Sequence, residues 1–126
     1  MERVRFIDHM GNQILLIDCT ECGPRELVEV FKEVQQVVTS QPPGSVLTMA
    51  DFTDAEFDKA AADQMKLVAA YDRAHVRRSA IVGADFLPDV YYRGLLSFSA
   101  RDFPVFKTRE EALDWLVSDK LERAAG

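Results

Sequence analysis

The chain opens with two short segments that have the hydrophobic pattern of β-strands. In residues 3–9, apolar side chains such as Val4 and Phe6 alternate with charged ones, and an apolar run over residues 14–17 follows Gly11-Asn12. Glycine and asparagine both accept the positive φ that a two-residue hairpin turn requires. The pattern predicts an antiparallel hairpin that turns at Gly11-Asn12, with the second strand more deeply buried.

Apolar residues then recur at helical spacing over residues 24–40, and Pro24 is suited to the first helical turn. A third strand is predicted over residues 45–51. Thr53-x-x-Glu56 has the sequence of a capping box that opens a second helix. One face of this helix is expected to contain Phe57, Ala61, Met65, Val68 and Tyr71.

The second half of the chain repeats this alternation of strand and helix. A short apolar strand is predicted over residues 79–83, and Pro88 fits the first turn of a third helix. Residues 103–106 are predicted to form an edge strand, because Pro104 has no N–H to donate to a ladder. Thr108-x-x-Glu111 is a second capping box and opens the last helix.

The order of these elements, β-β-α-β-α-β-α-β-α, predicts an α/β fold. Strands separated by helices need right-handed crossovers and therefore pair mostly in parallel, whereas the initial hairpin makes one edge of the sheet antiparallel. We expect a single domain over residues 1–126, with a mixed, mostly parallel five-stranded sheet and about four helices. Residues 120–126 are expected to be a frayed tail.

Composition narrows the classes of function. The 126 residues include 15 Lys and Arg against 21 Asp and Glu, a net charge of -6, so the chain lacks the cationic surface that nucleic acid or an anionic membrane requires. No segment is long enough to cross a bilayer, and two cysteines are too few for a disulfide framework. We expect a cytoplasmic protein with no nucleic-acid partner, no membrane insertion and no cofactor.

Four segments of the chain carry a resemblance to a known family. They are Ser40-Gln-Pro-Pro-Gly-Ser-Val-Leu-Thr48, Arg78-Ser-Ala-Ile-Val-Gly83, Leu96-Ser-Phe-Ser-Ala-Arg101 and Phe106-Lys-Thr-Arg-Glu-Glu-Ala-Leu-Asp-Trp-Leu116. Together they resemble the STAS-like, SpoIIAA-like domains of small bacterial proteins, over roughly residues 3–118. The resemblance implies the same fold. In the related anti-anti-sigma factors, a partner kinase phosphorylates a serine at the start of the helix after the third strand. Met49-Ala-Asp-Phe-Thr53 occupies that place here, without the usual Ser-Ser-Gly.

Asp51, Thr53 and Asp54 form the candidate partner or switch surface, because ligands and switches usually lie at the carboxyl ends of parallel strands. The loops near Cys22 and over residues 83–85 are expected at the same end. Thr53 is the hydroxyl best placed for phosphorylation, but the surrounding carboxylates oppose added negative charge. A plain helix cap is the alternative, and we favour it.

Cys19-Thr-Glu-Cys22 has C-x-x-C spacing at a strand-to-helix junction, where a thiolate would be stabilised. A redox pair is one interpretation, and two incidental small apolar residues are the favoured one. His9 and His75 do not lie at ligand spacing from these cysteines, so we predict no metal site.

Aromatic residues are concentrated between residues 86 and 106, with arginines nearby. Such a set can line a pocket for an apolar anion such as a fatty acid or lipid. The candidate pocket residues are Tyr91, Tyr92, Arg93, Phe98 and Arg101. Core packing of Tyr91, Leu95 and Phe98 is the favoured alternative, which leaves Tyr92 and Arg93 as the better candidates for a pocket.

No complete catalytic motif is present, and none of the serines lies in a G-x-S-x-G elbow. The sequence therefore predicts a non-enzymatic regulatory or protein-interaction module with an unidentified protein partner. The alternative is a small carrier of an apolar ligand or lipid, built on residues 86–106. A homodimer is also expected, because small domains with open sheet edges often pair.

Overall fold

The structure is a computed structural model that describes residues 2–118. Five strands form one sheet in the order β1-β2-β3-β4-β5, in which β1 and β2 are antiparallel and all other neighbours are parallel. The α/β fold, the mixed sheet and the N-terminal hairpin are therefore confirmed. The strands are β1 (Val4–His9), β2 (Asn12–Asp18), β3 (Val46–Asp51), β4 (Val76–Val82) and β5 (Val105–Phe106). The helices are α1 (Pro24–Thr39), α2 (Lys59–Asp72), α3 (Asp89–Ser99) and α4 (Arg109–Leu116), with a short 3-10 helix η1 (Ala84–Phe86).

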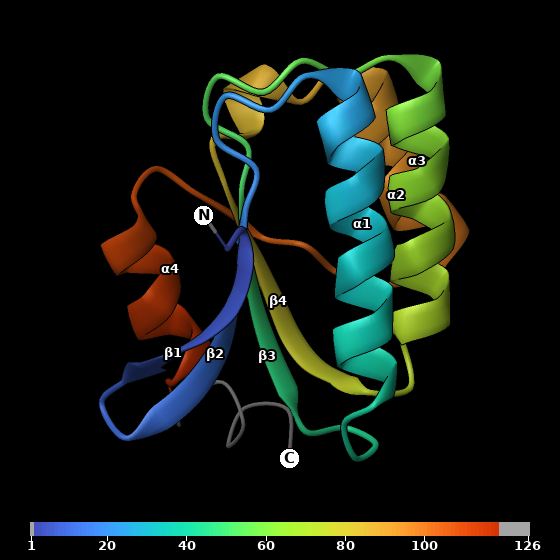
Figure 1. Ribbon diagram of the computed structural model, residues 1–126. Helices are drawn as coiled ribbons and strands as arrows, with labels where there is room; N and C mark the ends of the chain where they lie inside the picture. The colour runs from blue at the N-terminus through green and yellow to red at the C-terminus, as the bar shows by residue number, and fades with distance from the viewer. Residues whose placement is uncertain (1, 119–126) are drawn as a thin grey trace.

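Helices cover both faces of the sheet, with α1, α2 and α3 on one face and α4 on the other (Figure 1). The inner strand β2 accordingly carries apolar side chains on both sides. Leu15 and Ile17 belong to the core beneath α1–α3, whereas Ile14 and Leu16 belong to the smaller core beneath α4. A strand buried on both faces is a continuous apolar run, which is the pattern of residues 14–17.

The loops that follow β2, β3 and β4 gather at the carboxyl end of the sheet (Figure 1). Backbone hydrogen bonds join them, because Glu21 N donates to Thr53 O at 3.0 Å and Phe52 N donates to Val82 O at 2.9 Å. The predicted meeting of these loops at one end is confirmed. This end of the sheet carries the candidate functional site.

The hairpin turn lies one residue earlier than predicted. Its turn residues are Met10 and Gly11, which have positive φ values of 51° and 80°, and Asn12 already pairs with His9 across the ladder. The Asn12 side chain donates to Met10 O at 3.3 Å, so asparagine supports the turn from the first position of β2.

The predicted start of the second helix is also wrong. α2 begins at Lys59, and its N-cap is Asp58, whose Oδ1 accepts from Ala61 N at 2.8 Å. The Thr53 hydroxyl does not cap a helix because it donates to Asp51 instead, at 2.7 Å. By contrast, the second capping box is confirmed at its N-cap, where Thr108 Oγ1 accepts from Glu111 N at 3.1 Å.

Two residues assigned to helix core faces lie at the surface. Tyr71 in the last turn of α2 is 64% exposed, and Phe98 in α3 is 54% exposed. Helical spacing gives the direction of a side chain but not the reach of the sheet beneath it, so positions near the ends of a predicted apolar stripe can extend past the core.

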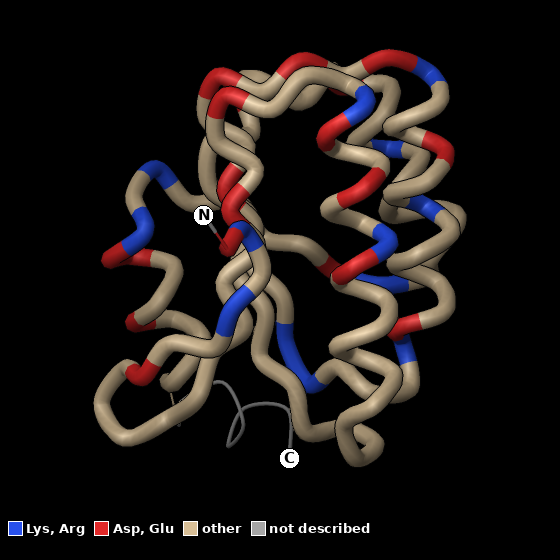
Figure 2. The backbone as a smooth tube through the Cα atoms, viewed as in Figure 1, with Lys and Arg blue, Asp and Glu red and all other residues tan. Residues whose placement is uncertain are grey.

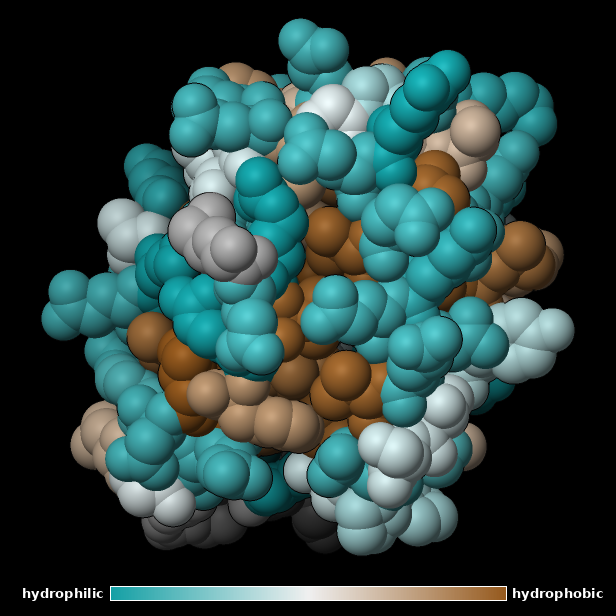
Figure 3. Space-filling model, in the orientation of Figure 1, coloured by the Kyte–Doolittle hydropathy of each residue, from teal (hydrophilic) through white to brown (hydrophobic). Residues whose placement is uncertain are grey.

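Apolar side chains gather in the middle of the face in Figure 3, where Figure 1 places the hairpin beside α1.

β1 is an edge strand of the sheet. Such an open edge is the basis of the expected homodimer, which stays a prediction. Within residues 2–118, no helix combines the length and apolarity of a membrane span. The predicted frayed tail at residues 120–126 lies outside the described residues.

Candidate functional site

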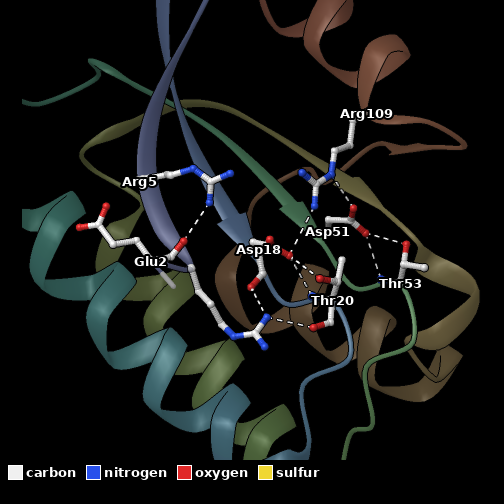
Figure 4. A network of polar contacts seen from close by, with 8 residues as sticks. Glu2, Arg5, Asp18, Thr20, Asp51, Thr53 and Arg109 are labelled. Carbon is white, nitrogen blue, oxygen red and sulfur yellow. Dashed lines mark hydrogen bonds and ion pairs between the residues drawn. The ribbon is translucent and has the colours of Figure 1, made fainter.

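The same short turn follows two neighbouring strands at the carboxyl end of the sheet. After β2, Thr20 donates to Oδ1 of Asp18 from both its backbone N at 3.1 Å and its hydroxyl at 2.7 Å. After β3, Thr53 contacts Oδ1 of Asp51 in the same two ways, at 3.0 and 2.7 Å. Asp18 and Asp51 are register partners on adjacent strands, so the two Asp-x-Thr turns lie side by side (Figure 4).

Each Asp-x-Thr turn continues into a residue with left-handed backbone. Glu21 has a φ of 59° and Asp54 a φ of 60°, and each turn closes with a hydrogen bond from the next residue, Cys22 N to Cys19 O or Ala55 N to Phe52 O. Residues other than glycine are uncommon in this conformation, which carries some strain. The strain persists because backbone hydrogen bonds hold both turns in place.

Gly83 lets the β4 loop approach the second turn closely. It has a φ of 74°, and a Cβ at this position would lie 2.6 Å from Thr53 N and 2.7 Å from Thr53 Oγ1. Such distances are too short for any side chain, so glycine is required both by the backbone conformation and by the contact. Thr53 is thus held between Asp51 and Gly83.

Arg109 contacts both carboxylates from the face of the sheet that α4 covers. It lies in the first turn of α4, and its Nε donates to Asp51 Oδ2 at 2.7 Å while its Nη2 lies 3.4 Å from Asp18 Oδ1 (Figure 4). Arg3 from the N-terminal segment donates to the carbonyl oxygens of Asp18 at 3.1 Å and Thr20 at 2.9 Å. The two arginines link the N-terminal segment and the last helix to the paired turns.

Asp18 and Asp51 are buried residues, with relative exposures of 8% and 5%. Burial alone would raise the pKa of Asp18, but the hydrogen bonds from Thr20 and the charges of Arg109 and Arg3 outweigh burial and lower it. Asp18 is therefore ionised in the folded protein at neutral pH. Its charge is satisfied internally and is not presented to a ligand.

The side chains presented to solvent at this end are other carboxylates. Glu21 and Asp54, at the left-handed positions, and Glu56 just beyond are exposed, and Glu56 N donates to Cys22 O at 2.9 Å. We call these three residues the acidic rim. Figure 2 shows acidic residues along the loops at this end of the fold. Among the described residues, no group of three or more His, Cys, Asp or Glu side chains is placed to hold a metal ion.

The three residues of the predicted partner or switch surface lie together here but differ in access. Asp51 is buried beneath Arg109, Thr53 is half-buried, and Asp54 is exposed. A phosphate on Thr53 would have to break the hydroxyl bond to Asp51 and enter beside its carboxylate, at a position packed against Gly83. These contacts favour a structural role for Thr53, in a turn and not in a helix cap.

Cys19 and Cys22 are free thiols with no solvent exposure. Burial is the main cause that raises the pKa of both thiols, that of Cys19 well above its ordinary value. The expectation that this junction stabilises a thiolate is wrong, because desolvation dominates here. The histidines lie elsewhere, with His9 Nε2 3.0 Å from Asp114 Oδ1 and His75 Nδ1 2.7 Å from Gln41 O.

The aromatic residues of the predicted ligand pocket do not converge on one site. Tyr91 packs against Phe57, with ring centroids 6.4 Å apart, and Phe98 lies beneath Lys66. Arg93 is exposed and pairs with Asp89 at 3.0 Å. Three of the five predicted pocket residues thus contact different neighbours.

The remaining two, Tyr92 and Arg101, line a common groove of about 820 Å³ that does not include Tyr91. The Tyr92 hydroxyl donates to Phe103 O at 2.7 Å, and the Arg101 guanidinium stacks 4.5 Å from the centroid of the Phe103 ring. Arg101 also reaches inward, since Nη1 donates to Ala69 O at 2.9 Å and Nη2 to Ser79 Oγ at 2.5 Å. It separates this groove from the core.

Several residues of these polar clusters were not identified from the sequence, and Asp18, Arg109 and Asp72 show why. Asp18 had a detectable signal, because Asp18-Cys-Thr20 and Asp51-Phe-Thr53 are the same Asp-x-Thr pattern at two predicted strand ends. Arg109 had none, since it lies in a different helix and reaches the turns only in the folded domain. Asp72, a buried carboxylate at the end of α2, likewise had none.

Comparison with known proteins does not assign this arrangement. No protein-family model matches the chain, and neither a curated protein nor a solved structure matches it.

Proposed function

We propose that the protein is a non-enzymatic regulatory or protein-interaction module that binds a partner through the acidic rim of Glu21, Asp54 and Glu56. The observation that carries this proposal is the pair of Asp-x-Thr turns, which hold exposed carboxylates on a fixed backbone. A surface that is already ordered loses little conformational entropy when a partner binds. The resemblance to STAS-like domains supports the same class of function.

The partner is a protein with a basic contact surface. Exposed carboxylates accelerate association with a surface of opposite charge and disfavour acidic competitors. The chain as a whole carries a net charge of -6, which adds to the same long-range attraction. We therefore expect salt to weaken this complex, as it does for charge-steered complexes in general.

The contacts of the two threonines support binding over catalysis. Both hydroxyls donate to carboxylates, and Arg109 contacts both of these carboxylates. A nucleophile needs a base that takes its proton and an open side from which it attacks. Here the carboxylates are held by a cation, and Thr53 is packed against Gly83.

The test compares two charge reversals of equal size in the full-length, affinity-tagged chain expressed in its own cells. Asp54→Lys with Glu56→Lys alters the rim, and Glu29→Lys with Glu33→Lys alters exposed carboxylates of α1. Proteins that co-purify with each variant are quantified by mass spectrometry, and thermal unfolding establishes that both variants are folded. We expect basic proteins retained by the wild type and by the α1 variant to fall about tenfold with the rim variant.

Equal retention of the same proteins by the rim and α1 variants would contradict the proposal. The same holds if the proteins lost with the rim variant are no more basic than those that remain, because the rim would then not act through its charge.

A further inference from the structure

The core between the sheet and helices α1–α3 contains a cavity of about 60 Å³. Its walls are mainly apolar and include Ile17, Phe31, Met65 and Leu95. A sphere the size of one water molecule occupies about 10–15 Å³, so the cavity has room for roughly four to six groups of that size. It is therefore larger than an ordinary packing defect.

Three polar or charged residues also line this cavity. They are Thr48, Asp72 and Arg101. The Thr48 hydroxyl is engaged, since it lies 2.6 Å from Ser79 Oγ. The Arg101 guanidinium is engaged as well, through its bonds to Ala69 O and Ser79 Oγ and its stacking on Phe103.

Asp72 differs from these neighbours because its carboxylate lacks a donor. The residue is 2% exposed, and its Oδ1 has no hydrogen-bond partner among the described residues. Buried carboxylate oxygens without a donor are costly and rare in folded proteins. Desolvation raises the pKa of Asp72 to about 7, although the charges of Arg101 and His75 act in the opposite direction. The carboxylate thus lines a cavity that could hold a donor.

We propose that this cavity binds a small, neutral, mainly apolar molecule whose single hydroxyl or amide N–H donates to Oδ1 of Asp72. The apolar walls fit the body of such a molecule, and the lone acceptor fits its donor. A cation would meet the charge of Arg101 and an anion that of Asp72, so charged ligands are disfavoured. The size of the cavity limits the ligand to about four to six non-hydrogen atoms. This site does not depend on the acidic rim.

Two isomers provide a matched pair of probes. Isobutanol and diethyl ether have the same atoms, but only isobutanol has a hydroxyl that can donate. Each is titrated into the full-length protein while NMR records the methyl resonances of Met65, Leu95 and Ile17, which line the cavity. We expect isobutanol to shift these resonances with an affinity about tenfold higher than that of diethyl ether, because only isobutanol supplies Asp72 with a donor.

Two substitutions test the role of Asp72 in this binding. Asp72→Leu removes the acceptor and keeps a similar volume, so isobutanol should lose its advantage over diethyl ether. Thr48→Val is the matched control, because it changes a second polar wall residue whose hydroxyl is already paired with Ser79. This variant should retain the preference. The comparison of the two isomers on the wild type remains decisive if Asp72→Leu does not fold.

Equal affinities of the wild type for the two isomers would overturn the proposal, as would unchanged methyl resonances with both probes, which would leave water as the occupant. An equal loss of isobutanol binding in Thr48→Val and Asp72→Leu would overturn it too, because the effect would then follow from altered packing.

Discussion

Buried carboxylates at the two ends of the sheet have opposite surroundings. At the carboxyl end, Asp18 accepts two hydrogen bonds from Thr20 and faces Arg109, and its pKa is lowered despite burial. In the last turn of α2, Asp72 has an Oδ1 without a donor, and its pKa rises to about 7 because burial dominates. The same side chain is thus a structural anchor at one end and an unsatisfied acceptor at the other.

The difference depends on where the neighbouring donors point. Arg109 directs its guanidinium at Asp51 and Asp18, whereas Arg101 donates to Ala69 O and Ser79 Oγ. A nearby cation lowers a carboxylate pKa by its charge, but only aimed N–H or O–H groups replace the hydrogen bonds lost from water. Proximity of opposite charges does not by itself satisfy a buried group.

Removing Arg109, the cation that contacts Asp18 and Asp51, should have the largest effect on stability. Arg109→Ala leaves Asp18 and Asp51 as adjacent buried carboxylates, and we expect the free energy of unfolding to fall by about 3 kcal/mol. Denaturant unfolding at pH 7 measures the change. Arg93→Ala, which removes an exposed ion pair with Asp89, is the control and should cost about 0.5 kcal/mol or less. Equal costs for the two variants would mean that Arg109 does not hold the carboxylates together.

The next test separates the close contact at Gly83 from its backbone conformation. Gly83→Ala places a Cβ against Thr53 and should displace the threonine from Asp51, at a cost of about 2–3 kcal/mol. Gly44→Ala is the matched control, since Gly44 also has a positive φ, of 63°, but has open space around its Cβ. It should cost about 1 kcal/mol. If both substitutions cost the same in denaturant unfolding, the contact with Thr53 contributes nothing beyond the backbone conformation.

The unpaired carboxylate of Asp72 should make the stability of the protein depend on pH. Folding raises the pKa of Asp72 from 3.8 to about 7, so between these values the folded protein holds a proton that the unfolded chain has released. The contribution of Asp72 to stability therefore falls as pH rises through this window, and the Asp72→Asn variant lacks this contribution. Relative to the wild type, Asp72→Asn should gain up to about 2 kcal/mol between pH 5 and pH 8 in denaturant unfolding.

Asp63→Asn is the control for this pH dependence. The hydrogen bond from Lys59 lowers the pKa of Asp63, so its linkage to folding lies below pH 3.8 and its difference from the wild type should stay constant between pH 5 and pH 8. If the difference in stability between Asp72→Asn and the wild type also stays constant between pH 5 and pH 8, burial does not raise the pKa of Asp72. The contrast between Asp18 and Asp72 would then be lost.

Much of the fold was predictable because its signals are local. The apolar run of residues 14–17 predicted a deeply buried strand, and helical spacing after Pro24 predicted α1 almost to its ends. Where two local signals competed, the prediction failed. Thr53-x-x-Glu56 matches a capping box, but Asp51 lies two residues before Thr53, and the Thr53 hydroxyl donates to its carboxylate.

The sequence by itself determined the order of elements, the sheet class and the end of the sheet where the loops meet, because hydrophobic periodicity and crossover rules act over short stretches of chain. Only the tertiary structure decided that Arg109 contacts both Asp18 and Asp51, and that Asp72 lacks a donor. Burial and the aim of a distant N–H group depend on segments far apart in the chain. The surroundings of each carboxylate, and therefore its role, are set only in the folded domain.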